Sequence, residues 1–312
     1  PKVARALGPL AAGSPDLAPV VVGAEATAVD VLRAALTSSV LRLLDHDAGV
    51  RLGDDAEEVH QARVATRRLR SDLRTYRSLL DPDWSDGLRE ELRGVAAALG
   101  AVRDADVLLE RLGAAVGDLR PEDARQGRHL LDRLSSERDT GRAGLLTLMD
   151  DPAYAALLER LVAAAREPVV LQEASAPAEA VLPGLVVGPW KHLDKAAAGV
   201  GPDSPDDALH EIRIRAKRCR YAAEVAAFAV GRPATRFAKA VAEVQEVLGS
   251  FQDAVVTEDW LRQASSRAPA ARALVAGQLI GASRAEAAAA RRNWLAAWKA
   301  LDRPKLRSWM RP

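Results

Sequence analysis

VHQARVATRRLRSDLRTY, residues 59–76, combines apolar and basic side chains at the spacing of an α-helix. At about 100° per residue, the apolar side chains form one stripe that can pack against other helices; they are Ala62, Ala65, Leu69, Leu73 and Tyr76. The opposite arc carries basic side chains and no acid: His60, Arg63, Arg67, Arg70, Arg74 and Arg77. Arg68 lies off this arc. The stretch therefore predicts a helix with one packed side and one basic side.

A second stretch, LHEIRIRAKRCRY (residues 209–221), repeats this pattern. His60, Arg63, Arg67, Arg68 and Arg70 are matched 150 positions later by His210, Arg213, Lys217, Arg218 and Arg220. Behind the second arc lie Ile212, Cys219, Ala223 and Ala226. LGAVRDADV (99–107) is likewise matched by LGSFQDAVV (248–256), one residue out of register. Two copies of this size predict duplicated helical bundles related by a pseudo-twofold axis, because solenoids use shorter and more numerous units.

The composition is that of a soluble globular protein, with 48% hydrophobic and 28% charged residues among 312. Alanine is abundant and few stretches alternate like strands, so the expected fold class is all-α. No apolar run is long enough to span a membrane, and the first residues lack the core of a secretory signal. The single cysteine, Cys219, excludes an intramolecular disulfide and fits a reducing, cytoplasmic compartment.

The chain divides into a leader or linker (1–22), rich in Pro and Gly, and a helical domain (23–308). Helices of the first repeat (24–166) are expected at 25–45, 56–80, 84–98, 103–116, 122–149 and 152–166, with a loop at 45–55. A linker at 167–184 precedes the second repeat (185–302), with helices expected at 187–198, 205–230, 234–249, 253–266 and 268–301. The initial proline leads us to expect a piece of a longer protein.

The two basic arcs require something that offsets their repulsion. Either a bound polyanion or acids from a facing helix would do so, and the sequence leaves both open. From residue 60 to 74 the helix rises roughly 21 Å, a length that suits a linear chain of phosphates bound by guanidinium groups. Two facing rows would line a channel or cleft. No aromatic residue interleaves with the arginines, which disfavours single-stranded nucleic acid, whose bases require stacking platforms.

The paired H-x-x-R-x-x-x-[RK]-R-x-R helices (60–70 and 210–220) and the LG-x-x-R-D-x-D-V stretch (99–107) resemble the conserved histidine α-helical domain (CHAD) family, over about residues 24–302. The resemblance implies two four-helix bundles around a basic central pore or groove. It also implies binding of inorganic polyphosphate, association with polyphosphate granules, no enzymatic activity and no cofactor.

Carried over by position, the resemblance assigns phosphate contact to His60, Arg63, Arg67, Arg70, His210, Arg213, Lys217 and Arg220. Arg74 extends the first row, and Arg103 matches the second motif. Further candidates lie off the arcs or on other helices: Arg68, Arg218, Lys191, Lys195, Arg138, Arg142, Arg291 and Arg292.

The two repeats are not equivalent in charge. Asp104 and Asp253 match, and both are expected to be buried anchors that pair with helix arginines. In contrast, Glu224, Gln252 and Val255 stand where the first repeat has Arg74, Arg103 and Asp106.

Other chemistry finds less support in the sequence. Phosphohistidine enzymes keep a second histidine and an acid close by, and no R-H-G signature occurs here. We therefore expect His60 and His210 either to donate hydrogen bonds to a bound phosphate or to bridge residues within the bundle. Asp45, His46 and Asp47 lack further ligands at fixed spacing, so no metal site is expected. Neither G-x-x-x-x-G-K-[ST] nor G-x-G-x-x-G occurs, so a nucleotide loop is not supported.

Two other functions stay open beside polyphosphate binding. One is an accessory module that presents polyphosphate to a polyphosphate-metabolising enzyme, and the other is a general polyanion or nucleic-acid binder. The leader PKVARALG also resembles the junction that follows a triphosphate tunnel metalloenzyme domain, which makes such a fused domain an expected partner. No membrane partner is expected.

Overall fold

The structure is a computed structural model that describes residues 16–23, 25–53, 55–201 and 203–310. Most of the expected leader (1–22) therefore lies outside the described residues. Within these ranges the fold is all-α, as the sequence predicts, and the only extended contacts are isolated bridges between Thr27 and Pro177 and between Leu80 and Val170. None of the described helices combines the length and apolar character that crossing a membrane requires.

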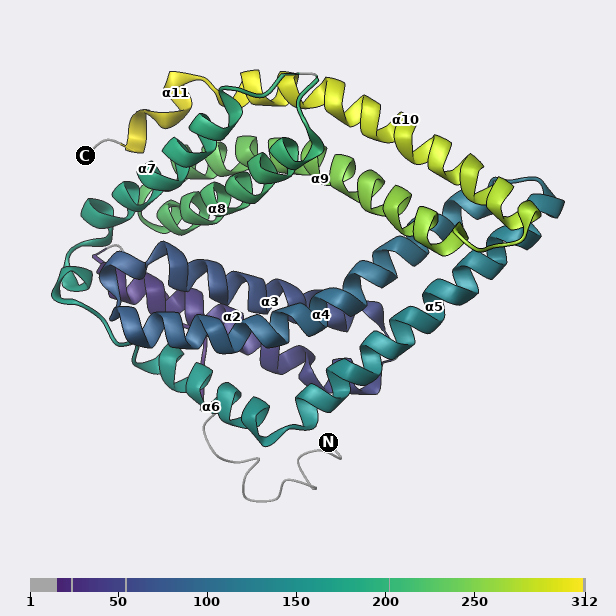
Figure 1. Ribbon diagram of the computed structural model, residues 1–312. Helices are drawn as coiled ribbons and strands as arrows, with labels where there is room; N and C mark the ends of the chain where they lie inside the picture. Colours follow the sequence, from purple (N-terminus) through teal and green to yellow (C-terminus); the bar gives the residue numbers. More distant parts are fainter. Residues whose placement is uncertain (1–15, 24, 54, 202, 311–312) are drawn as a thin grey trace.

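Among the described residues, the first half of the fold comprises α2 (Ala28–Leu52), α3 (Ala56–Thr75), the 3-10 turn η2 (Arg77–Leu79), α4 (Pro82–Gly117), α5 (Pro121–Asp150) and α6 (Pro152–Arg166). α3 packs between α2 and α4, α5 returns along α4, and α6 packs on α2 (Figure 1). The predicted stripe of α3, from Ala62 to Tyr76, is buried. The opposite side of α3 therefore carries its arginines away from this core.

The second half begins after η3 (Gln172–Ser175) with α7 (Ala178–Ala197), followed by α8 (Asp206–Val230), α9 (Arg232–Ser265) and α10 (Ala270–Leu301). The described part of the second half ends with the short α11 (Pro304–Arg307) and η4 (Ser308–Met310). α8 packs between α7 and α9, and α10 returns along α9. The side chains expected behind the second basic arc, Ile212, Cys219, Ala223 and Ala226, are buried.

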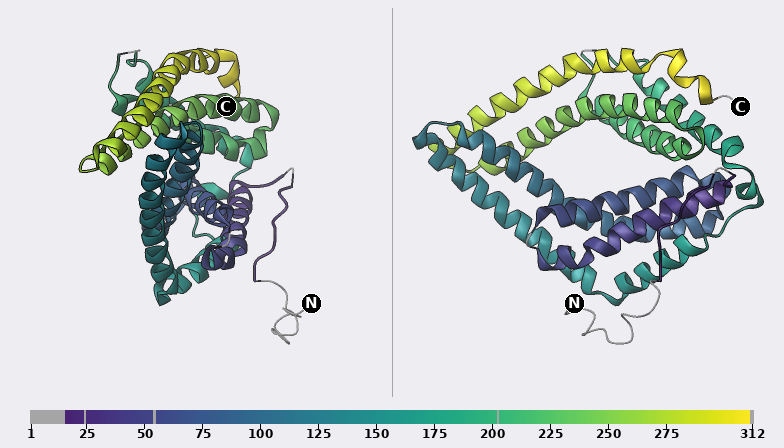
Figure 2. Two further views of the ribbon diagram at one scale, coloured as in Figure 1. Left: turned by 90° about the vertical axis from the view of Figure 1, so that its right-hand side faces the viewer. Right: turned by 180° about the vertical axis from the view of Figure 1, so that it is seen from behind.

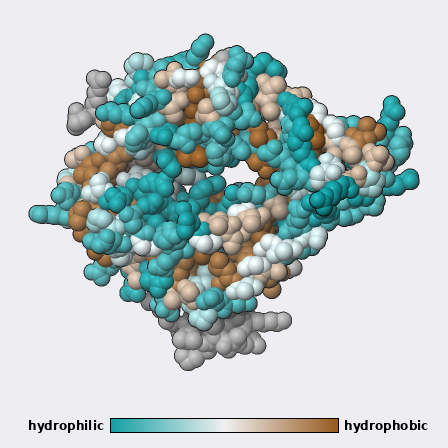
Figure 3. Space-filling view, viewed as in Figure 1, coloured by the Kyte–Doolittle hydropathy of each residue, from teal (hydrophilic) through white to brown (hydrophobic). Residues whose placement is uncertain are grey.

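The two halves meet at both ends of the molecule. At one end α3 contacts α8 and α2 contacts α7. At the other end, α4 and α5 reach α9 and α10 and share a second core, in which Leu112, Leu130 and Leu134 pack with Leu261 and Val275 (Figure 2). Between these ends the space-filling view shows an opening bounded by α3 and α4 on one side and α9 on the other (Figure 3).

Two expected helix ends in the first half are wrong. The expected loop at 45–55 is mostly helix, because Asp47 and Arg51 form an i,i+4 ion pair and Val50 is buried. α2 ends instead at Leu52, and Gly53 caps it with a φ of 80°, which glycine adopts at little cost. α3 ends at Thr75 and not at residue 80, so Arg77 belongs to η2 and pairs with Asp86.

The predictions of two helix interruptions and of the extent of one linker are also wrong. The segments 84–98 and 103–116 form the single helix α4, and 234–249 and 253–266 form the single helix α9. A helical glycine costs about 1 kcal/mol, and burial of the side chains beside Gly100 and Gly249 outweighs this: Leu99, Val102, Leu248 and Phe251. α7 begins at Ala178, within the expected linker, because burial of Leu182 and Val186 favours the helix although it contains two prolines.

Candidate functional site

The basic sides of α3 and α8 face each other where the two halves meet. The α3 row comprises His60, Arg63, Arg67, Arg70 and Arg74; the α8 row comprises His210, Arg213, Lys217 and Arg220. Burial lowers the pKa of Arg213, and Arg67 and Arg63 lower it further, against the raising effect of Asp253. The rows therefore lie close enough to repel each other.

Lys217 lies in the same cluster of cations. Burial lowers the pKa of its ammonium group to about 8, and the guanidinium groups of Arg213, Arg67 and Arg63 contribute to the shift. Asp253 opposes the change without reversing it. A lysine near pKa 8 exchanges its proton close to physiological pH, and an incoming anion would favour its charged form.

Most of the facing cations have no acid that neutralises them. Among the described residues, Arg67, Arg70, Arg213 and Lys217 form no ion pair, and Nε of each of the three arginines is buried without a hydrogen-bond partner. A buried donor without a partner costs free energy, so such groups are rare in native proteins. The fold thus holds these cations in place and leaves their hydrogen-bonding capacity unused.

One arginine of the α3 row does pair with a facing helix. Arg63 Nη1 lies 2.7 Å from Oδ1 of Asp104 on α4. However, Asp104 is 65% exposed and Asp253 is exposed too, so the expectation of buried anchors is wrong. Asp253 also forms no ion pair among the described residues. α4 and α9 each continue through the second motif as one helix, so their apolar sides pack in the core. Asp104 and Asp253 therefore lie on the exposed side of these helices.

The glycines of the second motif lie against the two rows. A Cβ at Gly100 would be 3.9 Å from Nε of Arg63, and a Cβ at Gly249 would be 3.8 Å from Nε of Arg213. A side chain larger than a methyl group at either position would therefore displace a guanidinium group. Both copies of the motif thus keep the residue beside the guanidinium group small.

The two histidines have different surroundings. Burial lowers the pKa of His60, and Arg103, Arg67 and Arg63 also lower it while Glu57 opposes them. His210 Nδ1 lies 2.6 Å from Oε1 of Gln252, which accepts the hydrogen bond. Gln252 occupies the position that Arg103 has in the first half. Each histidine is therefore accompanied by the second motif, but by a cation in one half and an amide in the other.

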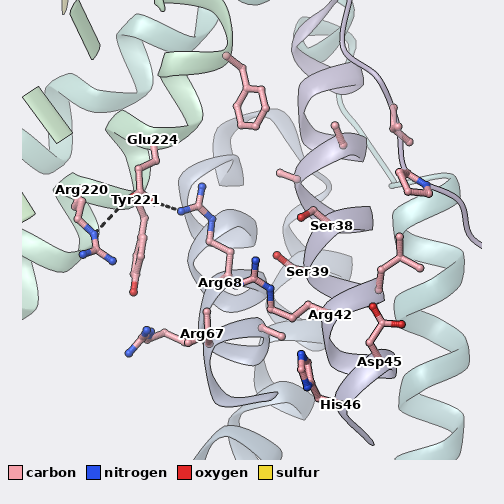
Figure 4. A pocket seen from close by; sticks show the side chains of 18 residues that line it. Ser38, Ser39, Arg42, Asp45, His46, Arg67, Arg68, Arg220, Tyr221 and Glu224 are labelled. Atoms are coloured by element: carbon pink, nitrogen blue, oxygen red, sulfur yellow. Dashed lines mark hydrogen bonds and ion pairs between the residues drawn. The ribbon is translucent and has the colours of Figure 1, made fainter. Parts of the chain in front are cut away.

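Arg68 and Arg220 are neutralised within the protein. Glu224 forms an ion pair with both arginines, at 3.2 Å from Nε of Arg220 (Figure 4). Arg68 also lies 3.2 Å from Asp72, a fully buried carboxyl whose pKa burial raises to about 6 although Arg68 opposes this. The ring of Tyr221 lies near both guanidinium groups. These two arginines of the predicted set therefore have structural partners.

The remaining candidates lie apart from the facing rows or serve other contacts. Arg138 pairs with Asp139, Arg142 donates to the carbonyl of Arg51 at 3.0 Å, and Arg291 pairs with Asp206. Lys191, Lys195 and Arg292 are exposed. Arg218 is exposed as well, and it is close enough to Arg74 to lower the pKa of that residue.

His46 and Asp47, for which no metal site is expected, contact other residues of the protein. His46 Nδ1 lies 2.7 Å from Glu58, and Asp47 pairs with Arg51 and accepts a hydrogen bond from Tyr154. Across the described part of the chain, no group of three or more His, Cys, Asp or Glu side chains could hold a metal ion.

The family model described as CHAD domain matches residues 34–262. The chain belongs to the CHAD domain family. Two curated relatives from Mycobacterium tuberculosis, uncharacterized proteins MT2285 and Rv2226, are each 33% identical in an alignment of 279 residues that covers 84% of this chain and 50% of the relative. The chain thus spans about half the length of the curated relatives it matches.

Two solved structures resemble this CHAD domain. PptA from Streptomyces chartreusis has a TM-score of 0.73 and 26% identity, covering 88% of this chain and 99% of PptA. The CHAD domain from the plant Ricinus communis has a TM-score of 0.72 and 26% identity, covering 92% and 96%. Both similarities therefore extend over most of this chain.

Two hollows flank the facing rows of this CHAD domain. The α2 hollow, about 760 Å³, lies between α2, α3 and α8 and includes Arg42, Arg67, Arg68, Arg220 and Glu224 in its lining (Figure 4). The α7 hollow, about 530 Å³, lies between α3, α4, α7 and α8, and its lining includes Arg74, Arg89, His192, Arg215 and Arg218. Sequence reasoning did not find Arg42, Arg89 or His192, although the 150-residue offset, applied to α2 and α7, pairs Arg42 with His192.

Proposed function

We propose that this CHAD domain binds inorganic polyphosphate between the α3 row and the α8 row. The observation that carries the proposal is the cluster of Arg67, Arg213 and Lys217, cations from both helices that lie close together without an ion pair among the described residues. A protein that used these side chains only for structure would be expected to surround them with acids, as it does for Arg68. A polyanion would relieve the repulsion and accept the unused hydrogen bonds.

Polyphosphate fits this arrangement better than other anions. Its charges follow one another along a flexible chain, as the cations do along α3. Guanidinium groups can each donate paired hydrogen bonds to phosphate oxygens. Two aromatic residues line the α2 side of the rows: Tyr221 is buried near Arg68 and Arg220, and Phe228 is exposed. Among the described lining residues, Phe228 is thus a single place for a nucleobase to stack, whereas the cations form a continuous row.

We further propose that the two halves are copies of one bundle, related by a pseudo-twofold axis around a basic central pore. The linings of the two hollows support this duplication, because the same positions recur at an offset of 150. On α2 and α7 the pairs are Ala35 and Leu185, Ser38 and Gly188, Ser39 and Pro189, and Arg42 and His192. On α3 and α8 they are Ala65 and Arg215, Arg68 and Arg218, Ser71 and Tyr221, and Arg74 and Glu224.

The cellular role follows from binding and not from catalysis in this proposal. Among the described residues, neither histidine is hydrogen-bonded to an acid that would make it a nucleophile: His210 contacts the amide of Gln252, and His60 lies among arginines whose effect Glu57 only partly opposes. Binding of this kind would place the protein on cytoplasmic polyphosphate granules. Because the curated relatives are about twice as long, the domain would also be suited to present polyphosphate to an enzyme domain, such as a triphosphate tunnel domain, in a longer chain.

Titration calorimetry tests the proposal directly. Long-chain polyphosphate should bind, and excess tRNA or duplex DNA should not displace it. A nucleic acid that competes at equal phosphate concentration would instead indicate a general polyanion binder. Absence of binding at low ionic strength, where phosphate contacts are strongest, would refute the proposal.

A further inference from the structure

The two hollows occupy equivalent positions but differ in charge. The α2 hollow is lined by four arginines and two acids, Asp45 and Glu224, whereas the α7 hollow is lined by five arginines and no acid. The difference depends largely on one pair of equivalent positions. Glu224 stands in the α2 hollow where Arg74 stands in the α7 hollow.

In the α2 hollow, acids neutralise part of the positive charge. Glu224 pairs with Arg68 and with Arg220, and Asp72 pairs with Arg68 from behind. Figure 4 shows the dashed contacts from Glu224 to the guanidinium groups of Arg68 and Arg220 on either side of it. An anion that entered here would have to displace Glu224 from both arginines and face its negative charge.

In the α7 hollow, the positions equivalent to Arg68 and Glu224 both carry cations, Arg218 and Arg74. Arg74 and Arg218 are both exposed and form no ion pair among the described residues. Desolvation, together with Arg218, Arg89 and Arg70, lowers the pKa of Arg74 to about 10. The other three arginines here pair with acids that do not line the hollow: Arg77 and Arg89 pair with Asp86, and Arg215 pairs with Glu211.

The α7 hollow is also continuous with the α3 row. Arg63, Arg67, Arg70 and Arg74 follow one another at intervals of three or four residues, so they form one stripe. From Arg63 to Arg74 this stripe rises roughly 16 Å. A linear anion bound between the rows can therefore extend along α3 into the α7 hollow without leaving cationic surface.

We propose that a polyphosphate chain held between α3 and α8 continues into the α7 hollow, over Arg74 and Arg218, and not into its counterpart around Glu224. This inference rests on the proposed function and adds a direction to it. Each half contributes a row, but only the hollow beside α7 keeps the charge of an anion subsite. The bound chain therefore leaves the central site on one side of the pseudo-twofold axis.

Three substitutions test this asymmetry, with long-chain polyphosphate as the probe. Arg218→Ala removes one cation from the α7 hollow, and Arg42→Ala removes one exposed cation from the α2 hollow as a control of equal charge. Arg74→Glu places in the α7 hollow the acid that the α2 hollow already has. We expect Arg218→Ala to weaken binding by about fivefold and Arg74→Glu by about tenfold or more, as lost charge-assisted contacts would give. Arg42→Ala should stay within about twofold of wild type.

A second measurement does not depend on how the variants fold. In the wild-type protein, long-chain polyphosphate should protect Arg74 and Arg218 from modification by phenylglyoxal, detected by mass spectrometry, and leave Arg42 reactive. Equal protection of Arg42, or equal losses in Arg42→Ala and Arg218→Ala, would overturn the inference. The proposed function would then still stand if Arg63→Ala with Arg67→Ala weakens binding, and it fails separately if the wild-type protein does not bind polyphosphate.

Discussion

Replacing Lys217 with methionine tests whether burying this cation among the facing arginines destabilises the free protein. Methionine keeps the length and the apolar stem of lysine and removes the ammonium group. Burial and three neighbouring guanidinium groups lower the pKa of Lys217 from 10.5 to about 8. At neutral pH the folded protein therefore holds a charge that the unfolded chain would hold at lower free-energy cost.

The size of the effect follows from the pKa. A change from 10.5 to about 8 corresponds to about 3 kcal/mol, at about 1.4 kcal/mol per pKa unit. Lys217 is only half-buried, and salt screens part of the repulsion. We therefore expect Lys217→Met to raise the free energy of unfolding by about 1–3 kcal/mol at pH 7, with a melting temperature higher by about 2–4 °C per kcal/mol.

The gain should depend on pH in a defined direction. Because the pKa is lower in the folded protein, the unfolded chain binds more protons between about pH 8 and 10.5. The cost of Lys217 to the wild-type protein is complete below about pH 8 and is relieved as pH rises above it. The advantage of Lys217→Met over wild type should therefore shrink from pH 7 toward pH 10.

Urea unfolding followed by circular dichroism at these pH values measures the gain. Lys239→Met, at an exposed lysine on α9, is the matched control and should change stability little. Lys217→Met should also bind long-chain polyphosphate more weakly than wild type, so stability and binding move in opposite directions. A variant that unfolds more easily than wild type at pH 7 would refute the reasoning, because Lys217 would then have a stabilising partner.

The histidines, Arg68 and the response to salt provide three more tests. Polyphosphate affinity should increase as pH falls from about 8 to 6, because phosphate favours protonated imidazole. Below about pH 7, where Lys217 with its pKa of about 8 is already charged, calorimetry should show this increase flattened in His60→Gln with His210→Gln. An increase that survives there would mean that the histidines are not ligands. Arg68→Ala should lower the free energy of unfolding by about 3 kcal/mol in urea titrations, because buried Asp72 loses its cation; an unchanged stability would contradict its structural role. The logarithm of the association constant should fall linearly with the logarithm of salt concentration, by about 0.7 per phosphate contacted, and a flat response would exclude phosphate contacts as the basis of binding.

The helical class and the packed side of α3 could be predicted because the local pattern alone determines them. Five apolar positions at helical spacing leave α3 one way to bury its stripe, and Ala62 through Tyr76 are indeed buried. The basic arc follows from the same geometry, since residues at intervals of three and four share a side. The repeat then predicts a second such helix in α8, which the structure contains.

Contacts between distant segments could not be predicted in the same way. Glu224 was recognised in the sequence only as a departure from the repeat, yet it pairs with Arg68 from the other half of the chain. Asp104 was expected to be buried, and it is exposed because α4 continues through the motif as one helix. The predicted helix ends are wrong where α4 and α9 continue through Gly100 and Gly249 and α7 continues through Pro183, because burial of neighbouring side chains outweighs the local cost of these residues.

The claim that both rows hold one chain is tested most directly by removing each row in turn. Arg63→Ala with Arg67→Ala removes cations from the α3 row, and Arg213→Ala with Lys217→Ala removes them from the α8 row. Each pair should weaken binding of long-chain polyphosphate by about a hundredfold or more, because the second row engages at high effective concentration only while the first holds the chain. Orthophosphate, which is too small to reach both rows, should bind each double variant within a few-fold of wild type. If only one pair weakens long-chain binding, or if each pair weakens long-chain polyphosphate and orthophosphate equally, the two rows do not act on one ligand.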